Sequence, residues 1–383
     1  MTDAIPAQSP PRSPLLWGLF CACSWTWCIG MYLPVLLINR FGWPGFLAFA
    51  APNIIGCSTM AFVLSRRGGQ QSARVRSEAS VATHKRMMVA FSLLTIAYQV
   101  FFAVWLTSEL IPKMPQPQWA PLTVGAVVCL LGMVFGFLSD RDWLALAIVT
   151  YLISLAAIFA IGTGGFDRVP MSGSLAQQKL WWLLPTLCFG FLLCPYLDLT
   201  FHRAVQASSQ PRVSFVLFGI AFAIMLGLTV MLWFSPDVWY RRLTAQLAVG
   251  HVLAQLIFTI GAHAREVRLS GMFDSAGRRT AAMLAPLIAV PALPIARLLL
   301  DESVAGEWTY LAFLACYGLL FPAYVIVAMA TGSPLRSRTA WLAFAGLIVL
   351  GAPLYAKGFL FGQTPWLVPP VAVFLAWGML RRE

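Results

Sequence analysis

Apolar residues are grouped in long runs that short polar stretches separate, along almost the whole chain. Runs of about 20 apolar residues are typical of helices that cross a lipid bilayer. The expected spans are approximately 14–38, 44–65, 87–110, 119–138, 142–162, 179–201, 213–234, 245–263, 280–299, 308–331, 340–356 and 364–380. The pattern therefore predicts an all-α polytopic membrane protein with about twelve transmembrane helices.

The connections between these spans are short. The longest is residues 66–86, "RRGGQQSARVRSEASVATHKR", which leaves no room for a separate soluble catalytic or nucleic-acid-binding domain. The apolar run after Pro14 is too long for a cleavable signal and is expected to be the first span. Any function must then reside among the helices.

Composition and charge agree with this class. Hydrophobic residues make up 60% of the chain and charged residues 10%, too few for an ordinary soluble surface. With the N-terminus inside, 18 of the 26 Lys and Arg residues fall on inner segments and 8 on outer ones. This asymmetry predicts a multi-pass protein of the bacterial inner membrane with both termini cytoplasmic. The net charge of +12 thus reflects topology and contact with anionic lipid, not nucleic-acid binding.

The residues that usually carry chemistry are sparse. The eight cysteines lie in or beside apolar runs, where free buried thiols occur, and their spacing does not match a metal site. The chain has no HExxH or GxSxG motif, no phosphate-binding loop and no paired acidic motif on one helix. We therefore expect neither an enzyme nor a bound metal or cofactor.

Two spans carry a glycine followed closely by a proline. Gly30 precedes Pro34 in "SWTWCIGMYLP", and Gly190 precedes Pro195 in "FGFLLCPYLD". The first and sixth spans cross in opposite directions, so inversion across the membrane plane relates the two breaks. Interrupted helices at matching positions of two inverted halves indicate the substrate site of a secondary transporter. A packed kink is the alternative interpretation of each pair.

The stretch "PYLD" favours a true interruption of the sixth span. Proline suits the first position of a helix, and an acidic side chain is stabilised in the first turn. We expect a half-helix that begins at Pro195 and holds Asp198 in its opening turn. A gating or ion-coupling role for Asp198 and a salt bridge to His202 or Arg203 are both compatible with the sequence.

This layout resembles the five-plus-five inverted-repeat fold of the neurotransmitter sodium symporters, the amino acid-polyamine-organocation superfamily and the sodium/solute symporters. The resemblance covers residues 14–331 and rests on layout, because the first span has "CIG" where many of these families have two nearby glycines. It implies a cytoplasmic tail at 1–13, repeats at 14–162 and 179–331, and two further spans with a short cytoplasmic tail at 340–383.

The resemblance also implies a central site between spans one, three, six and eight. Backbone at the breaks would offer carbonyls to a cation and N–H groups to an anion, and the third span would supply the hydroxyl of Tyr98. Trp25 and Trp27 lie near the first break and are suited to stacking on a substrate. The expected substrate-binding residues are Trp27, Cys28, Gly30, Met31, Tyr98, Gln99, Phe189, Gly190 and Cys194.

The eighth span carries a polar stripe, because His251, Gln255, Thr259 and His263 are spaced four apart. The resemblance implies that Thr259 contributes a hydroxyl to a sodium site against the first span. His251 is the first candidate for proton coupling, since imidazole titrates near neutral pH. Its alternative is a structural hydrogen bond to Gln255 or to a neighbouring helix. Thr259, His251 and Asp198 are therefore the predicted coupling residues, for sodium or for protons.

Other polar residues receive simpler interpretations. Glu109, Arg265 and Glu266 lie at the ends of spans, where we expect water to solvate them. Asn53 follows Pro52 directly and is expected to satisfy the carbonyl that this proline frees, with a position in the cavity as the alternative.

The preferred function is ion-coupled symport of a small organic solute by alternating access. A carrier of the major facilitator type is the first alternative, although the loop at 202–212 is short and the motif-like "GFLSDRD" at 136–142 lies in the wrong loop. A lipid-modifying enzyme and a partner-dependent sensor or scaffold are further alternatives. The expected partners are the solute and the bilayer, with no nucleic acid, and a homo-oligomer is compatible with the chain.

Overall fold

The computed structural model describes residues 13–66, 69–110, 117, 119–162, 164–235, 242–332 and 334–381, and every regular element in this part of the chain is helical. The first half comprises α1 (Pro14–Trp25), α2 (Cys28–Phe41), α3 (Trp43–Leu64), α4 (Gly69–Trp105), a π-helical turn (Leu106–Leu110), α5 (Ala120–Phe135) and α6 (Asp140–Ile161). The second half comprises α7 (Gln178–Leu193), a 3-10 turn (Cys194–Leu197), α8 (Leu199–Ala207), α9 (Pro211–Phe234), α11 (Arg242–Leu269), α12 (Ala276–Leu284), a 3-10 turn (Ala285–Ala289), α13 (Ala292–Leu299), α14 (Glu302–Ala315), a π turn (Cys316–Leu320), α15 (Phe321–Tyr324) and a π turn (Val325–Met329). The chain closes with α16 (Arg338–Phe359), a 3-10 turn (Thr364–Leu367) and α17 (Val368–Leu380).

These helices correspond to the predicted spans. Within the described ranges, seven helices are long and apolar enough to cross a membrane, and two bent helix pairs raise this number to nine. The helices α5 and α17 are shorter apolar helices, and the 22 residues of α6 cover the remaining apolar run. The prediction of an all-α polytopic membrane protein, with interrupted first and sixth spans, is confirmed.

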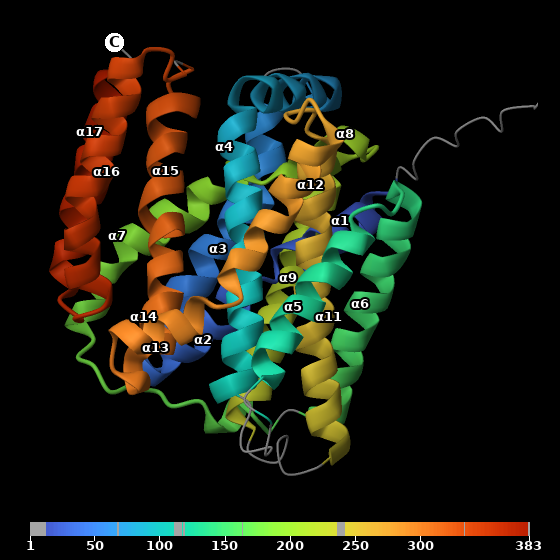
Figure 1. Ribbon diagram of the computed structural model, residues 1–383, viewed down its shortest axis with the longest axis vertical. Coiled ribbons are helices and arrows are strands. Elements are labelled where there is room, and N and C mark those ends of the chain that lie inside the picture. Colours follow the sequence, from blue (N-terminus) through green and yellow to red (C-terminus); the bar gives the residue numbers. More distant parts are fainter. Residues whose placement is uncertain are drawn as a thin grey trace, which may run out of the picture.

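The helices pack as one bundle with an appendage (Figure 1). In its interior, α1 packs against α9, α11 packs against α4, α5 and α6, and α3 lies against both α7 and α9. The last two helices, α16 and α17, stand together at one edge of the bundle, and the amino-terminal part of α4 lies across one end (Figure 1). Helices from both halves of the chain thus surround the interrupted first span.

A third interruption was not predicted. The span expected at 280–299 consists of two helical segments, Ala276–Ala289 and Ala292–Leu299, whose axes differ by 42°. Pro286 and Pro291 lie at this bend, and neither has a backbone N–H to donate to the preceding turn. The apolar run expected as the ninth span is therefore bent.

Candidate functional site

The interruption of the first span lies at Thr26 and Trp27, between α1 and α2, whose axes differ by 61°. The Thr26 hydroxyl donates to the carbonyl of Ala22 at 2.8 Å, and the Trp27 indole N–H donates to the carbonyl of Ser24. Both carbonyls lie in the last turn of α1, and that of Ala22 also accepts from the backbone N–H of Thr26 at 3.1 Å. Side chains of the break therefore terminate α1.

This position differs from the predicted one. Gly30 and Pro34, expected to form the break, both lie inside α2. The ring of a proline crowds the carbonyl four residues earlier, and here that residue is Gly30, which has no side chain of its own to pack there. Hydrogen bonds made by Thr26 and Trp27 interrupt the helix one turn before the residues that the sequence indicated.

The sixth span is interrupted between α7 and α8. Pro195 lies in the 3-10 turn that follows α7, and Asp198 is the N-cap of α8. Oδ1 of Asp198 accepts from the backbone N–H of Thr200 at 2.8 Å and from its hydroxyl at 2.7 Å. The half-helix thus begins at Leu199, not at Pro195, because the carboxylate satisfies the amide that a helix start leaves open. Gly190 lies within α7 and is not part of the interruption.

The two interruptions lie against each other. The hydroxyls of Ser24 and Thr200 are 3.0 Å apart, and both residues are fully buried. The rings of Trp25 and Phe201 are 5.0 Å apart between centroids. The end of α1 is therefore joined to the start of α8 by a polar contact and by an aromatic contact.

A cavity of about 10 Å³ lies where the two breaks meet, which is room for about one water molecule. It is lined by Trp25, Trp27, Ile29, Gly30, Asn53, Phe191, Cys194 and Tyr317. Most of this lining is aromatic or aliphatic, and it contains no charged side chain. The protein is thus closed around the centre, with ring faces and a few polar groups directed at the junction.

The polar groups of the lining have defined partners. Oδ1 of Asn53 accepts from the indole of Trp25 at 2.8 Å, so Asn53 faces the cavity and holds a tryptophan of the first break. The Cys194 thiol donates to the carbonyl of Tyr317 at 3.2 Å, and the Tyr317 hydroxyl lies 2.9 Å from that of Thr95. Of the two positions considered for Asn53, the cavity is the one observed.

Among the predicted substrate-binding residues, Trp27, Gly30 and Cys194 line this cavity. The predicted set lacks Ile29, Asn53, Phe191 and Tyr317, which reach the same space. Tyr317 lies in a π-helical turn of the tenth span, a span for which the sequence suggested no role. A local irregularity of this kind is often found at functional sites, but periodicity does not predict it.

Three other predicted residues, Cys28, Tyr98 and Gln99, do not line the cavity and make contacts at the amino-terminal end of α2. The amide oxygen of Gln99 accepts from the backbone N–H of Cys28 at 3.1 Å, at the start of α2. The hydroxyl of Tyr98 donates to the carbonyl of Tyr310 at 2.9 Å, and the Tyr310 hydroxyl donates to the carbonyl of Cys28 at 3.2 Å. These contacts from the third and tenth spans fix the amino-terminal end of α2.

The remaining predicted residues contact neighbouring helices. The carbonyl of Met31 accepts from the indole of Trp233 at 3.0 Å, and Phe189 is buried within α7. At Gly190 a Cβ would lie 2.8 Å from the carbonyl oxygen of Tyr317, so glycine permits the close approach of α7 to the tenth span. None of these three residues is part of the cavity lining.

The coupling candidates occupy different surroundings. The Thr259 hydroxyl donates to the carbonyl of Cys23 at 3.3 Å, which brings the eighth span against the first. Nδ1 of His251 lies 2.8 Å from the hydroxyl of Ser154, and the amide of Gln255 donates to the same oxygen at 3.1 Å. These contacts match the structural alternative for His251, a hydrogen bond to a neighbouring helix.

Asp198 does not make the predicted salt bridge to His202 or Arg203. His202 lies 2.9 Å from the Ser77 hydroxyl through Nδ1 and 3.0 Å from the Tyr196 carbonyl through Nε2. Arg203 pairs with Glu266. Asp198 instead faces His263 of α11, with 3.9 Å between Oδ2 of Asp198 and Nε2 of His263. His263 was predicted only as part of a polar stripe, because the sequence does not reveal which helix that stripe faces.

Charged residues close both ends of the bundle around the breaks. At one end Glu266 pairs with Arg203 at 3.1 Å and with Arg265 at 3.0 Å, and Arg265 also pairs with Asp140. Glu266 and Arg265 are buried, so the expectation that water solvates them was wrong. These pairs join the start of α6, the half-helix α8 and the end of α11.

The opposite end has a second set of pairs. Arg40 at the end of α2 pairs with Glu307 of α14, and Arg297 of α13 pairs with Glu109 at 2.6 Å. Glu109 also accepts from the indole N–H of Trp105 at 2.6 Å, and it is exposed, as expected for a residue at the end of a span. The first pair holds the half-helix α2 to the tenth span, and the second holds the ninth span to the end of the third.

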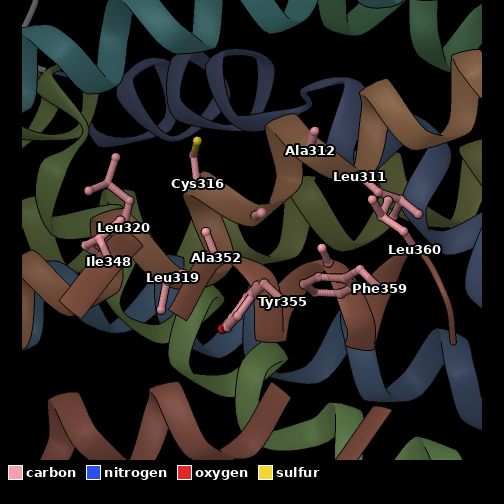
Figure 2. A pocket seen from close by; sticks show the side chains of 12 residues that line it. Leu311, Ala312, Cys316, Leu319, Leu320, Ile348, Ala352, Tyr355, Phe359 and Leu360 are labelled. Atoms are coloured by element: carbon pink, nitrogen blue, oxygen red, sulfur yellow. The ribbon is translucent and has the colours of Figure 1, made fainter. Parts of the chain in front are cut away.

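Two larger cavities lie outside the junction of the two breaks. One of about 300 Å³ lies between the tenth and eleventh spans and has apolar walls that include Leu311, Cys316 and Phe359 (Figure 2). The other, of about 290 Å³, is bordered by α4, α8 and α11, and Arg203 and Glu266 are among its residues. The described residues contain no group of three or more His, Cys, Asp and Glu side chains arranged to hold a metal ion.

No protein-family model matches the chain, and no curated protein matches it. Among solved structures, MhsT in complex with L-phenylalanine aligns over 98% of this chain and 100% of its own, with 14% identity and a TM-score of 0.50. A manganese transporter of Eremococcus coleocola, in complex with an aromatic bis-isothiourea substituted compound, aligns over 100% and 99%, with 13% identity and a TM-score of 0.49. The likeness to MhsT is one of fold, and it confirms the predicted resemblance to the inverted-repeat transporters.

Proposed function

We propose that this protein is a secondary transporter, an ion-coupled symporter that carries a small organic solute by alternating access. The central site lies where the first and sixth spans are interrupted, with the third and eighth spans beside it. We assign the protein to the bacterial inner membrane with both termini cytoplasmic, which is the orientation that the distribution of Lys and Arg favours.

One observation carries this proposal: both interruptions border the same cavity. Non-helical backbone at membrane depth is tolerated where it lines a cavity or is buried in protein, because its polar groups have no lipid partner. Here Trp27 from the first break and Cys194 from the second share one small space, although they belong to different halves of the chain. Two half-helices that end at one space form a site that can open toward either side.

The lining suggests the chemistry of the solute. Ile29 and Gly30 lie in the first turn of α2, where N–H groups have no partner within the helix, and both border the cavity. A helix amino-terminus of this kind favours a carboxylate, while Trp25, Phe191 and Tyr317 offer apolar surface. MhsT was solved with L-phenylalanine. Aromatic and branched amino acids are therefore the first compounds to test.

The charged residues at the two ends fit the same mechanism. With both sets of ion pairs formed and with room for about one water at the centre, the protein is in an occluded state. Release of the pair between Arg40 and Glu307 would free α2, and release of the pair between Arg203 and Glu266 would free α8. Alternating access then requires that the two sets open one at a time.

Labelling of single cysteines tests the proposal. A cysteine-free protein receives back Cys28, Cys194 or Cys129, all of which are buried in the closed state. A membrane-impermeant thiol reagent is applied from each side, with and without sodium, at two pH values, and with and without L-phenylalanine. We expect labelling of Cys28 and Cys194 to change with ions and with amino acid, and labelling of Cys129, which lies in α5, to stay constant.

The same experiment can contradict the proposal. If Cys28 and Cys194 stay protected under every condition, the interruptions are packed kinks and the transport mechanism is wrong. If both react but no amino acid in a screen of neutral side chains protects them, the cavity opens and the solute class is wrong. Uptake into proteoliposomes of any protecting compound then completes the test.

A further inference from the structure

Asp198 and His263 face each other through atoms that have no hydrogen-bond partner. Oδ2 of Asp198 lies 3.9 Å from Nε2 of His263, and both side chains are fully buried. Neither of these two atoms has a hydrogen-bond partner in the described part of the chain. A buried polar atom without a partner is costly, so two such atoms directed at each other indicate that something binds between them.

The other atoms of the pair already have partners. Oδ1 of Asp198 accepts both donors of Thr200, and Nδ1 of His263 lies 3.1 Å from the hydroxyl of Ser92. A serine hydroxyl can donate to a bare ring nitrogen or accept from a ring N–H. The contact with Ser92 therefore persists whether the imidazole is neutral or charged, and the open position is confined to Oδ2 and Nε2.

Few other charged groups compete for this position. The titratable side chains that act on Asp198 electrostatically are Cys21 of α1, Cys194 of the 3-10 turn and Glu266 of α11. Thiols are uncharged at neutral pH in their ordinary state. Glu266 is itself paired with Arg203 and with Arg265. His263 is otherwise surrounded by rings, with the centroid of Trp27 at 5.6 Å.

We infer that Asp198 and His263 together bind one proton and thereby couple the position of α8 to proton movement. This inference rests on the proposed function and names its coupling ion. With the proton present, the pair has no net charge and a single N–H···O or O–H···N bond joins α8 to α11. Without the proton, the pair carries one negative charge in a buried place, and this bond is lost or weakened.

The proton has a short route to water. The cavity of about 290 Å³ is lined by Leu199, which directly follows Asp198, and by Glu266, which lies one turn after His263 on α11. Lys85 and His202 also border this cavity. Movement of α8 away from α11 would expose Oδ2 to this space, so the proton passes to water without any other chemical change.

A sodium ion fits the position less well. Hard cations such as sodium prefer several oxygen ligands, whereas this position offers one free carboxylate oxygen and one ring nitrogen. The proton needs only the two atoms that face each other. The proposal therefore commits to the proton, and a response to sodium in place of pH is an outcome that would overturn it.

Infrared difference spectroscopy of the purified full-length protein tests this pair directly. Spectra between acid and alkaline buffers report the carboxylic acid C=O band and the imidazolium ring bands. We expect a titrating signal at physiological pH that is lost in Asp198→Asn and altered in His263→Gln. Asparagine is also a good N-cap, so α8 retains its start in the first variant. His251→Gln, on the same helix, is the matched control and should leave the signal unchanged.

Two readouts separate this inference from the proposed function. A signal that persists in Asp198→Asn, or that follows sodium and not pH, overturns the proton site. If labelling of Cys194 responds to a solute but equally at every pH in wild type and in Asp198→Asn, transport stands and proton coupling is wrong. If the infrared signal titrates as expected while Cys194 is never accessible, the proton site stands and the proposed function is wrong.

Discussion

Ser24 and Thr200 bring their hydroxyls to 3.0 Å from each other, although one lies at the end of α1 and the other at the start of α8. Thr200 also donates to Asp198, so this contact links the first interrupted span to the cap of the second. The end of α1 and the start of α8 are thus joined by a buried polar contact.

Removal of this contact should loosen the junction. In Ser24→Ala, Thr200 loses one partner, and we expect a loss of about 1 kcal/mol in the free energy of unfolding, since that is typical of one buried hydrogen bond. The measurement is thermal unfolding in detergent, together with labelling of Cys194. Thr229→Val is the control, because the Thr229 hydroxyl donates within α9 to the carbonyl of Met225. Equal stability of Ser24→Ala and wild type would contradict this role.

The ion pair between Arg40 and Glu307 should control the opening of its end of the bundle. It should contribute little to the stability of the protein. Both side chains are partly exposed, at 26% and 33%, and such pairs contribute less than about 1 kcal/mol. In Glu307→Gln we expect faster labelling of Cys28 from that side and an unchanged melting temperature. Glu302→Gln, on the same helix but 81% exposed, should behave as wild type. Unchanged labelling in Glu307→Gln would exclude a gating role.

Substitution of Glu266 should lower the stability of the protein far more than substitution of Glu307. Its side chain is 7% exposed and is shared by Arg203 and Arg265, so Glu266→Gln leaves two arginines short of a partner in a buried place. We expect a loss of about 3 kcal/mol, the usual cost of breaking a buried pair. Asp274→Asn is the control, because Asp274 pairs with Arg278 at a site where both are largely exposed. Similar melting temperatures of the two variants would show that the inner pairs contribute little.

Gly56 should tolerate no side chain. A Cβ at Gly56 would lie 2.0 Å from the carbonyl oxygen of Phe191, so Gly56→Ala must push α3 away from α7 beside the central cavity. We expect a strong decrease in folded protein by size-exclusion chromatography. Gly346→Ala in α16 meets no atom within 4 Å and should be neutral, or more stable by up to about 1 kcal/mol. If both variants fold equally well, the close approach of α3 to α7 is not required for folding.

The sequence indicated the spans and two interruptions, but it misplaced the residues that cause the first one. Glycine and proline are visible signals, whereas the hydrogen bonds of Thr26 and Trp27 to carbonyls of α1 depend on side-chain geometry. Pro34 and Gly30 both lie inside α2, so neither marks the interruption itself. A glycine and proline pair can therefore indicate that a span is interrupted, although the interruption itself lies one turn away from the pair.

Polar partners were harder to predict than spans. Nearness in sequence suggested His202 and Arg203 as partners of Asp198, yet those two side chains contact Ser77 and Glu266. The side chain that faces Asp198 belongs to α11, and the packing of α8 against α11 brings it there. The place of Tyr317 was equally hard to predict, because a π turn of the tenth span directs this residue to the cavity.

The sequence by itself determined that this chain is an all-α, multi-pass membrane protein, because apolar runs of bilayer length have no stable place in water. It also indicated interruptions in the first and sixth spans through glycine and proline residues, although Gly30, Pro34 and Gly190 themselves lie inside helices. Tertiary structure alone decided which atoms meet at the breaks, which charges close the two ends, and that Asp198 faces His263. Those contacts join residues distant in sequence, and only the packing of one helix against another sets the distance between them.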